Sequence, residues 1–127
     1  MNFLEYPLEF YAKELAIENI SIDVHVSPKN NIYCGRCWWK NNTGIIDIVE
    51  NEEETMLLTL AHEMVHIKQH VYDGFVHKSI WNGISFDVET SFRNKTYVNK
   101  YKSRNSPWEQ EAYHLEKILF NKLKEVS

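Results

Sequence analysis

The segment His62-Glu63-Met64-Val65-His66 contains two histidines four residues apart and a glutamate after the first. On a helix, which turns by about 100° per residue, side chains four positions apart lie on the same side, one turn from each other. Both imidazoles can then reach one Zn²⁺ ion at about 2.0–2.1 Å. Glu63 would lie beside the ion, where its carboxylate can take the proton of a water that attacks a carbonyl group. The pattern predicts metal-assisted hydrolysis, with His62 and His66 as metal ligands and Glu63 as general base.

A catalytic zinc ion usually has three protein ligands, so a third ligand has to come from another part of the chain. His70 continues the row of histidines, but it lies about 12 Å from His62 along a helix, and the two cannot bind one ion. The last predicted helix offers Glu109 and Glu111, which point about 200° apart, so only one of them can face the metal. Spacing does not choose between them. Glu109 could instead fold back onto Ser106 as the partner in a capping box.

The helices that would carry these residues have recognisable ends. The motif helix is expected to begin at Asn51 as N-cap, with Glu54 as its capping-box partner, and to end at Asp73-Gly74. The last helix is expected to begin at Ser106, because a proline at the first helical position follows it. Another helix is expected near the N-terminus, from about Pro7 to Asn19.

Strands are expected between the first two helices. Alternating or β-branched residues predict strands at 20–26, 32–40 and 45–49, with a turn at 41–44, and so a small three-stranded, mainly antiparallel sheet. The region 75–105 is less regular, and we expect a short hairpin around Trp81-Asn82-Gly83-Ile84 within a long connection. The fold class predicted from these elements is α+β, with residues 1–127 as one domain.

The composition limits the possible partners. The net charge of −4 gives no general attraction to nucleic acid or to anionic membranes. A local basic cluster remains possible as a phosphate contact, with two tyrosines that could stack on bases: Arg93, Lys95, Tyr97, Lys100, Tyr101, Lys102 and Arg104. We find no signal-peptide pattern and no long apolar run, so a cytoplasmic location is expected. Cys34 and Cys37 are expected to be reduced thiols, because the chain has no second cysteine pair to complete a zinc site.

The segments Leu58–Gln69 and Ser106–Ala112 together resemble the gluzincin metallopeptidases. In particular, they are similar to the compact minigluzincins and to the small SprT-like proteins of phages and bacteria. In gluzincins a small residue commonly follows the ligand glutamate by three positions, and Glu109 with Ala112 fits this pattern, whereas Glu111 is followed by His114. The resemblance implies a zincin-like fold, Zn²⁺ as cofactor, Glu109 as third ligand, and a substrate peptide added as a strand at the edge of the sheet.

The chain departs from the gluzincin pattern at Tyr113, where many members have an aspartate that orients a zinc histidine. A backbone carbonyl or the Tyr113 hydroxyl is expected to take that role. The group that stabilises the oxyanion is left open among four candidates on or near the last helix: Tyr97, Tyr101, Tyr113 and His114.

The expected function is zinc-dependent hydrolysis of peptide bonds in a peptide or protein substrate, with neither a membrane nor nucleic acid as the main partner. The expected ligands are His62, His66 and Glu109, and the expected general base is Glu63. A zinc-stabilised binding or regulatory protein, such as a phage accessory factor without peptidase activity, is the alternative.

Overall fold

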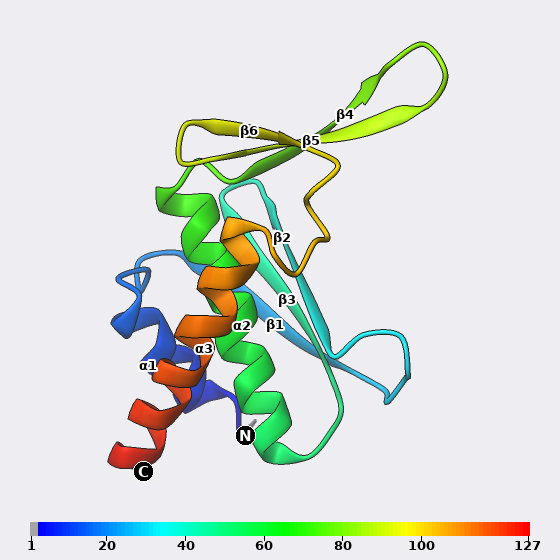
Figure 1. Ribbon diagram of the computed structural model, residues 1–127. Coiled ribbons are helices and arrows are strands. Elements are labelled where there is room, and N and C mark those ends of the chain that lie inside the picture. The colour runs from blue at the N-terminus through cyan, green and yellow to red at the C-terminus, as the bar shows by residue number, and fades with distance from the viewer. Residues whose placement is uncertain (1–2) are drawn as a thin grey trace.

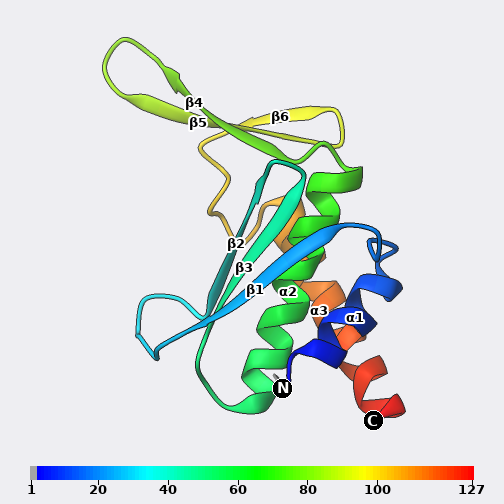
Figure 2. The same cartoon turned by 180° about the vertical axis from the view of Figure 1, so that it is seen from behind.

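The computed structural model describes residues 3–127, which form an α+β fold as predicted. In chain order the elements are α1 (Glu5–Glu14), β1 (Ser21–Ser27), β2 (Gly35–Lys40), β3 (Thr43–Val49), α2 (Glu53–Tyr72), β4 (Val76–Trp81), β5 (Phe86–Phe92), β6 (Lys95–Val98) and α3 (Pro107–Val126). The long helix α2 lies at the centre, between the sheet of β1 to β3 on one side and helices α1 and α3 on the other (Figures 1 and 2). A second sheet, formed by β4 to β6, lies beyond the C-terminal end of α2.

The first sheet has the strand order β1-β3-β2. Strand β2 pairs antiparallel with β3, but β1 pairs parallel with β3, so the prediction of a mainly antiparallel sheet was wrong for this pair. The chain reverses between β1 and β2 and again at Asn41-Asn42, so β3 returns in the direction of β1 and fits between the other two strands. Both asparagines have positive φ angles, 52° and 59°, which suit a two-residue hairpin turn.

Helix α2 packs closely on this sheet. Leu60, Met64 and Ile67, which lie on one side of the helix, are fully buried in the main core. Gly44 on β3 permits the close approach, since an added Cβ there would lie 2.9 Å from Cδ1 of Ile67. The sheet and α2 are therefore closely packed on each other. Strand β2 is one of the two edge strands of the sheet.

The second sheet is an antiparallel meander of β4, β5 and β6. The expected hairpin around Trp81–Ile84 is confirmed, but the long connection expected around it is mostly strand. The meander is closed by a second two-residue turn at Arg93-Asn94, where both φ angles are again positive. One end of this sheet packs on a small separate core made of Phe75, Phe92 and Trp108, flanked by Tyr97 and Tyr101.

The helix ends agree with the predictions at some positions and differ at others. Helix α1 ends at Glu14 instead of near Asn19, because Ala16 adopts a left-handed conformation (φ 57°) and the Ile17 N–H returns to the Ala12 carbonyl, which closes the helix. Helix α2 begins at Glu53, and Asn51 accepts a hydrogen bond only from the Glu52 N–H, so the predicted capping box is absent. None of the helices within residues 3–127 is both long and apolar enough to cross a membrane.

Candidate metal centre

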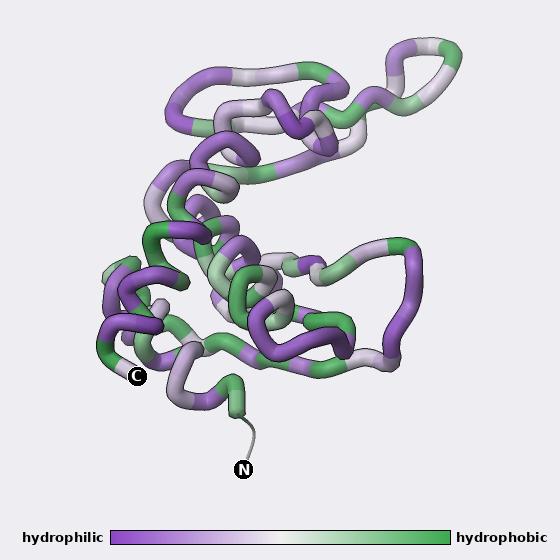
Figure 3. The backbone as a smooth tube through the Cα atoms, turned by 60° about the horizontal axis from the view of Figure 1, so that its bottom comes forward, coloured by the Kyte–Doolittle hydropathy of each residue, from purple (hydrophilic) through white to green (hydrophobic). Residues whose placement is uncertain are grey.

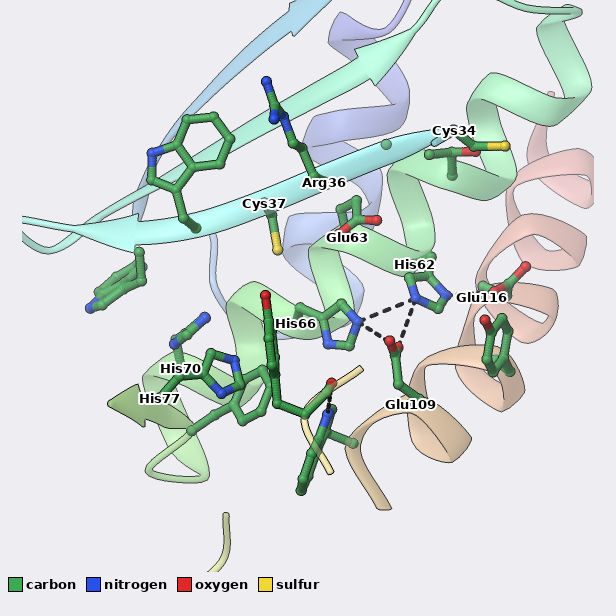
Figure 4. A pocket seen from close by; sticks show the side chains of 18 of the residues that line it. Cys34, Arg36, Cys37, His62, Glu63, His66, His70, His77, Glu109 and Glu116 are labelled. Atoms are coloured by element: carbon green, nitrogen blue, oxygen red, sulfur yellow. Dashed lines mark hydrogen bonds and ion pairs between the residues drawn. The ribbon is translucent and has the colours of Figure 1, made fainter. Parts of the chain in front are cut away.

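Three ligand atoms converge at the interface of α2 and α3. Nε2 of His66 lies 3.2 Å from Nε2 of His62, and Oε1 of Glu109 lies 3.1 Å from Nε2 of His62 and 2.8 Å from Nε2 of His66 (Figure 4). Within residues 3–127 these are the only three histidine, cysteine or acidic side chains that come together closely enough to share a metal ion. The two predicted ligands of α2 and the glutamate of α3 are therefore brought together.

The outer nitrogen of each imidazole is already engaged. Nδ1 of His62 lies 2.7 Å from Oε1 of Glu116, and Nδ1 of His66 lies 2.7 Å from Oε1 of Gln69. Because these oxygens are acceptors, each Nδ1 carries the proton, and the lone pair of a neutral imidazole is then on Nε2. Two lone pairs and a carboxylate oxygen thus point at one another, and only a cation placed among them makes this arrangement favourable.

Without a metal ion, a proton can serve as this cation. Burial on its own would lower the pKa of His62, but the hydrogen bonds with Glu109 and Glu116, together with the charge of Glu63, raise it to about 10. Burial would likewise raise the pKa of Glu109, but hydrogen bonds with His62 and His66 lower it to about 2. A divalent cation that binds here therefore displaces the proton on His62 and meets a fully ionised carboxylate.

Glu116 and Gln69 were not identified as site residues from the sequence. The expectation that Tyr113 or a carbonyl orients one of the histidines was wrong, because Glu116 orients His62 and Gln69 orients His66. The Tyr113 ring packs against the His62 imidazole, with centroids 4.9 Å apart. A signal existed for Glu116, which follows Glu109 by seven residues and so lies two helical turns away on the same side. Gln69 is fully buried and also donates to the Trp108 carbonyl at 2.9 Å, which ties α2 to the start of α3.

Glu109 and Glu111, between which the spacing could not choose, have different positions and partners in the structure. Glu109 points its side chain at the histidines, while its backbone N–H donates to Oγ of Ser106 at 3.4 Å, so the predicted N-cap forms without the glutamate side chain. Glu111 lies outside the cluster. It accepts from Nε2 of Gln69 at 2.9 Å and forms an ion pair with Arg93.

Glu63, the predicted base, is buried beside the cluster and faces strand β2 (Figure 4). Burial raises the pKa of Glu63, and the charges of His66 and His62 oppose this effect without cancelling it. Its nearest partner on β2 is Cys37, whose thiol is hydrogen-bonded to the carboxylate; burial and this carboxylate raise the pKa of the thiol. Cys37 is therefore a neutral thiol, and it lies inside the site. Cys34 is exposed and unpaired with it.

A cavity of about 880 Å³ opens onto these groups between β2 and the second sheet. Its wall away from the glutamates is aromatic, because Trp39 stacks on His70, with centroids 6.2 Å apart, and His77 packs on Tyr101 at 4.4 Å. As predicted, His70 is not part of the three-residue cluster. His77, which sequence reasoning did not select, is held by a 2.9 Å hydrogen bond between its Nδ1 and the Thr90 hydroxyl.

The four candidates for oxyanion stabilisation separate clearly. Tyr101 and Tyr113 line the cavity, whereas Tyr97 and His114 do not; Tyr97 packs on Trp108.

The basic cluster at residues 93–104 includes one residue that is already paired, because Arg93 forms ion pairs with Asp73 and Glu111. The two tyrosines of the cluster that could stack on bases both pack on protein rings, Tyr97 on Trp108 and Tyr101 on His77.

Comparison with known protein families, with curated proteins and with solved structures finds no significant match for this chain.

Proposed function

We propose that this chain is a zinc-dependent endopeptidase, in which His62, His66 and Glu109 hold the metal ion. The observation that carries the proposal is the convergence of three potential ligand atoms, Nε2 of both histidines and Oε1 of Glu109, while Nδ1 of each histidine is held by a partner side chain. Two imidazole nitrogens and one carboxylate oxygen form a donor set suited to Zn²⁺ that leaves a fourth position for water or substrate. When bound, the ion supplies Lewis acidity, which polarises a carbonyl group and lowers the pKa of water.

Glu63 acts as the general base in this proposal. Its carboxylate takes a proton from the attacking water and delivers that proton to the leaving nitrogen, so the N–H bond forms as the peptide C–N bond breaks. The buried position next to the histidines supports this role, because a carboxylate whose pKa is raised is a stronger base. Tyr101 and Tyr113, whose rings line the cavity, are the groups proposed to donate a hydrogen bond to the oxyanion.

The substrate would bind in extended form along β2. This strand is at the edge of its sheet, since β3 pairs with it on one side only, and residues 34–39 line the cavity. An edge strand offers backbone N–H and C=O groups that can pair with an added peptide. A peptide bound in this way would have one of its peptide bonds between β2 and the proposed metal ion.

Glu63→Gln tests the proposal because it keeps the size and burial of the side chain and removes its basicity. With zinc-loaded protein and a library of quenched fluorescent peptides, we expect hydrolysis to fall by at least ~100-fold. Zinc content should stay at one ion per chain. Glu54→Gln, an exposed position at the start of the same helix, is the matched control.

Two results would count against the peptidase. One is a Glu63→Gln protein as active as the wild type; the other is a wild-type protein that holds zinc and cleaves none of the peptides. The second result would favour the alternative of a zinc-stabilised binding or regulatory protein.

A further inference from the structure

The hairpin of β4 and β5 extends well beyond the body of the molecule (Figures 1 and 3). In the register of this pair, His77 is opposite Thr90, Ser79 opposite Val88, and Trp81 opposite Phe86. Because side chains alternate along a strand, all six lie on one face of the hairpin. We call the outer part of it, Ser79, Trp81, Phe86 and Val88, the hairpin face.

The hairpin face is apolar and open to solvent at its far end. The Trp81 and Phe86 rings contact each other edge to face, with centroids 5.1 Å apart, yet 58% of the first residue and 66% of the second remain exposed. Ile84 in the connecting turn is 89% exposed. Large apolar side chains that are grouped and exposed in this way mark a surface that binds another molecule.

The same face leads directly into the cavity. His77 lines the cavity, and Trp81 follows it by four residues, a distance of about 13 Å along the strand. Strand β4 is the edge of its sheet, so its outer backbone groups have no strand partner along this path. An extended chain leaving the cavity beside His77 can continue along β4, following the right-handed twist of the hairpin.

We propose that the hairpin face is a second binding site for the substrate, which takes an extended, unfolded polypeptide and holds a large apolar side chain of it against Trp81 and Phe86. This inference rests on the proposed peptidase function, since it concerns the same substrate. A segment of about four or more residues is needed between the cavity and the aromatic pair. Longer chains therefore bind both places at once and gain affinity over short peptides.

The charges near the tip argue for a polypeptide and against an anionic membrane. Residues 79–86 contain no lysine or arginine. Asp87 follows them on β5, and Lys78, which precedes them on β4, forms an ion pair with Glu89. A tip that inserts among anionic lipids gains most of its attraction from basic residues. The hairpin face continues into the cavity, so a chain bound in the cavity can extend onto it. This continuity favours the substrate over a second copy of the protein as the bound molecule.

The test measures binding, so that it does not depend on turnover. Zinc-loaded Glu63→Gln protein is titrated with a fluorescein-labelled 20-residue peptide of Gly, Ser and Thr with leucine at every fourth position, and with its six-residue fragment. We expect the 20-residue peptide to bind at least ~10-fold more tightly, and this advantage to disappear when Trp81→Ser and Phe86→Ser are added. Ile80→Ser with Val98→Ser, two apolar residues on the opposite face of the same sheet, is the matched control and should keep the advantage.

Three results would overturn the inference. The first is a double variant that keeps the full length advantage. The second is a control pair that loses it equally, which would place the effect in the stability of the sheet. The third is a protein that dimerises, or binds anionic vesicles, through Trp81 and Phe86 without a length advantage for peptides. If the wild type cleaves no peptide but the length advantage persists, the peptidase proposal fails and the binding site stands.

Discussion

Oε1 of Glu116 lies 2.7 Å from Nδ1 of His62, in a position to accept its proton and fix its Nε2 toward Glu109. Both glutamates are on α3, two turns apart, so a single helix supplies one group that would bind the metal and another that orients the neighbouring ligand. The positions of Glu109 and Glu116 relative to His62 depend on how α3 packs against α2. For this reason we expect Glu116 to affect metal binding without contacting the metal.

Glu116→Ala should weaken zinc binding by about 10- to 100-fold, because His62 loses the partner that sets its tautomer and direction. Glu116→Gln, which keeps an acceptor but not the charge, should have a smaller effect. Competition with a chromophoric zinc chelator measures the affinity, and Glu125→Ala, at an exposed position of the same helix, is the control. Equal affinities for Glu116→Ala and the wild type would refute this role.

Gly35 is predicted to set the distance between β2 and α2. A Cβ added there would overlap Cγ2 of Thr59 and lie 3.2 Å from the Asp47 carbonyl oxygen, so Gly35→Ala should lower the free energy of unfolding by about 1–3 kcal/mol. Thr59→Ser removes the overlapping methyl group and keeps the hydroxyl that donates to Thr55. In urea unfolding, the double variant should recover at least half of the loss. If Thr59→Ser gives no recovery, the overlap is not the cause.

His70 should make the protein sensitive to mild acid. Burial lowers the pKa of His70 from 6.5 to about 4, and the neighbouring charges of His77 and His66 act in the same direction. Between these two pH values the unfolded chain binds a proton that the folded chain does not, so this contribution to stability is complete above pH 6.5 and is lost as the pH falls toward 4. We expect a loss of about 3 kcal/mol over this interval, since one pKa unit corresponds to about 1.4 kcal/mol.

The comparison that isolates this effect is wild type against His70→Phe, both metal-free, with stability measured by urea unfolding from pH 7 to 4. Phenylalanine keeps a ring beside Trp39 and Phe75 but does not titrate. The variant should lose less stability on acidification. Parallel pH profiles for the two proteins would contradict the assignment.

The sequence was sufficient to predict the parts of the site that depend on local geometry. The spacing of His62 and His66 and the Ser106-Pro107 start of α3 are helical signals that tertiary structure did not change. The position of Glu109 beside the histidines was expected only from a resemblance. Its choice over Glu111 depends on how α3 is rotated against α2, which the buried Gln69 and Trp108 help to set.

The second sheet and the parallel strand pair were missed for a different reason. Pairing between β1 and β3 depends on contacts between distant residues, and no local pattern states the direction of a neighbouring strand. In β5 the alternation of Val88, Thr90 and Phe92 is present, but only its inner end is buried, so the pattern fades toward the exposed Phe86. The exposed half of that strand is also where we infer a binding surface.

The central claim is that His62, His66 and Glu109 bind one Zn²⁺ ion. Anomalous diffraction from crystals of the zinc-loaded protein, recorded above and below the zinc absorption edge, tests it most directly. The account predicts a single strong peak at about 2.0–2.2 Å from Nε2 of both histidines and from a carboxylate oxygen of Glu109. A zinc peak bound by other residues, or none at this cluster in zinc-saturated crystals, would contradict it.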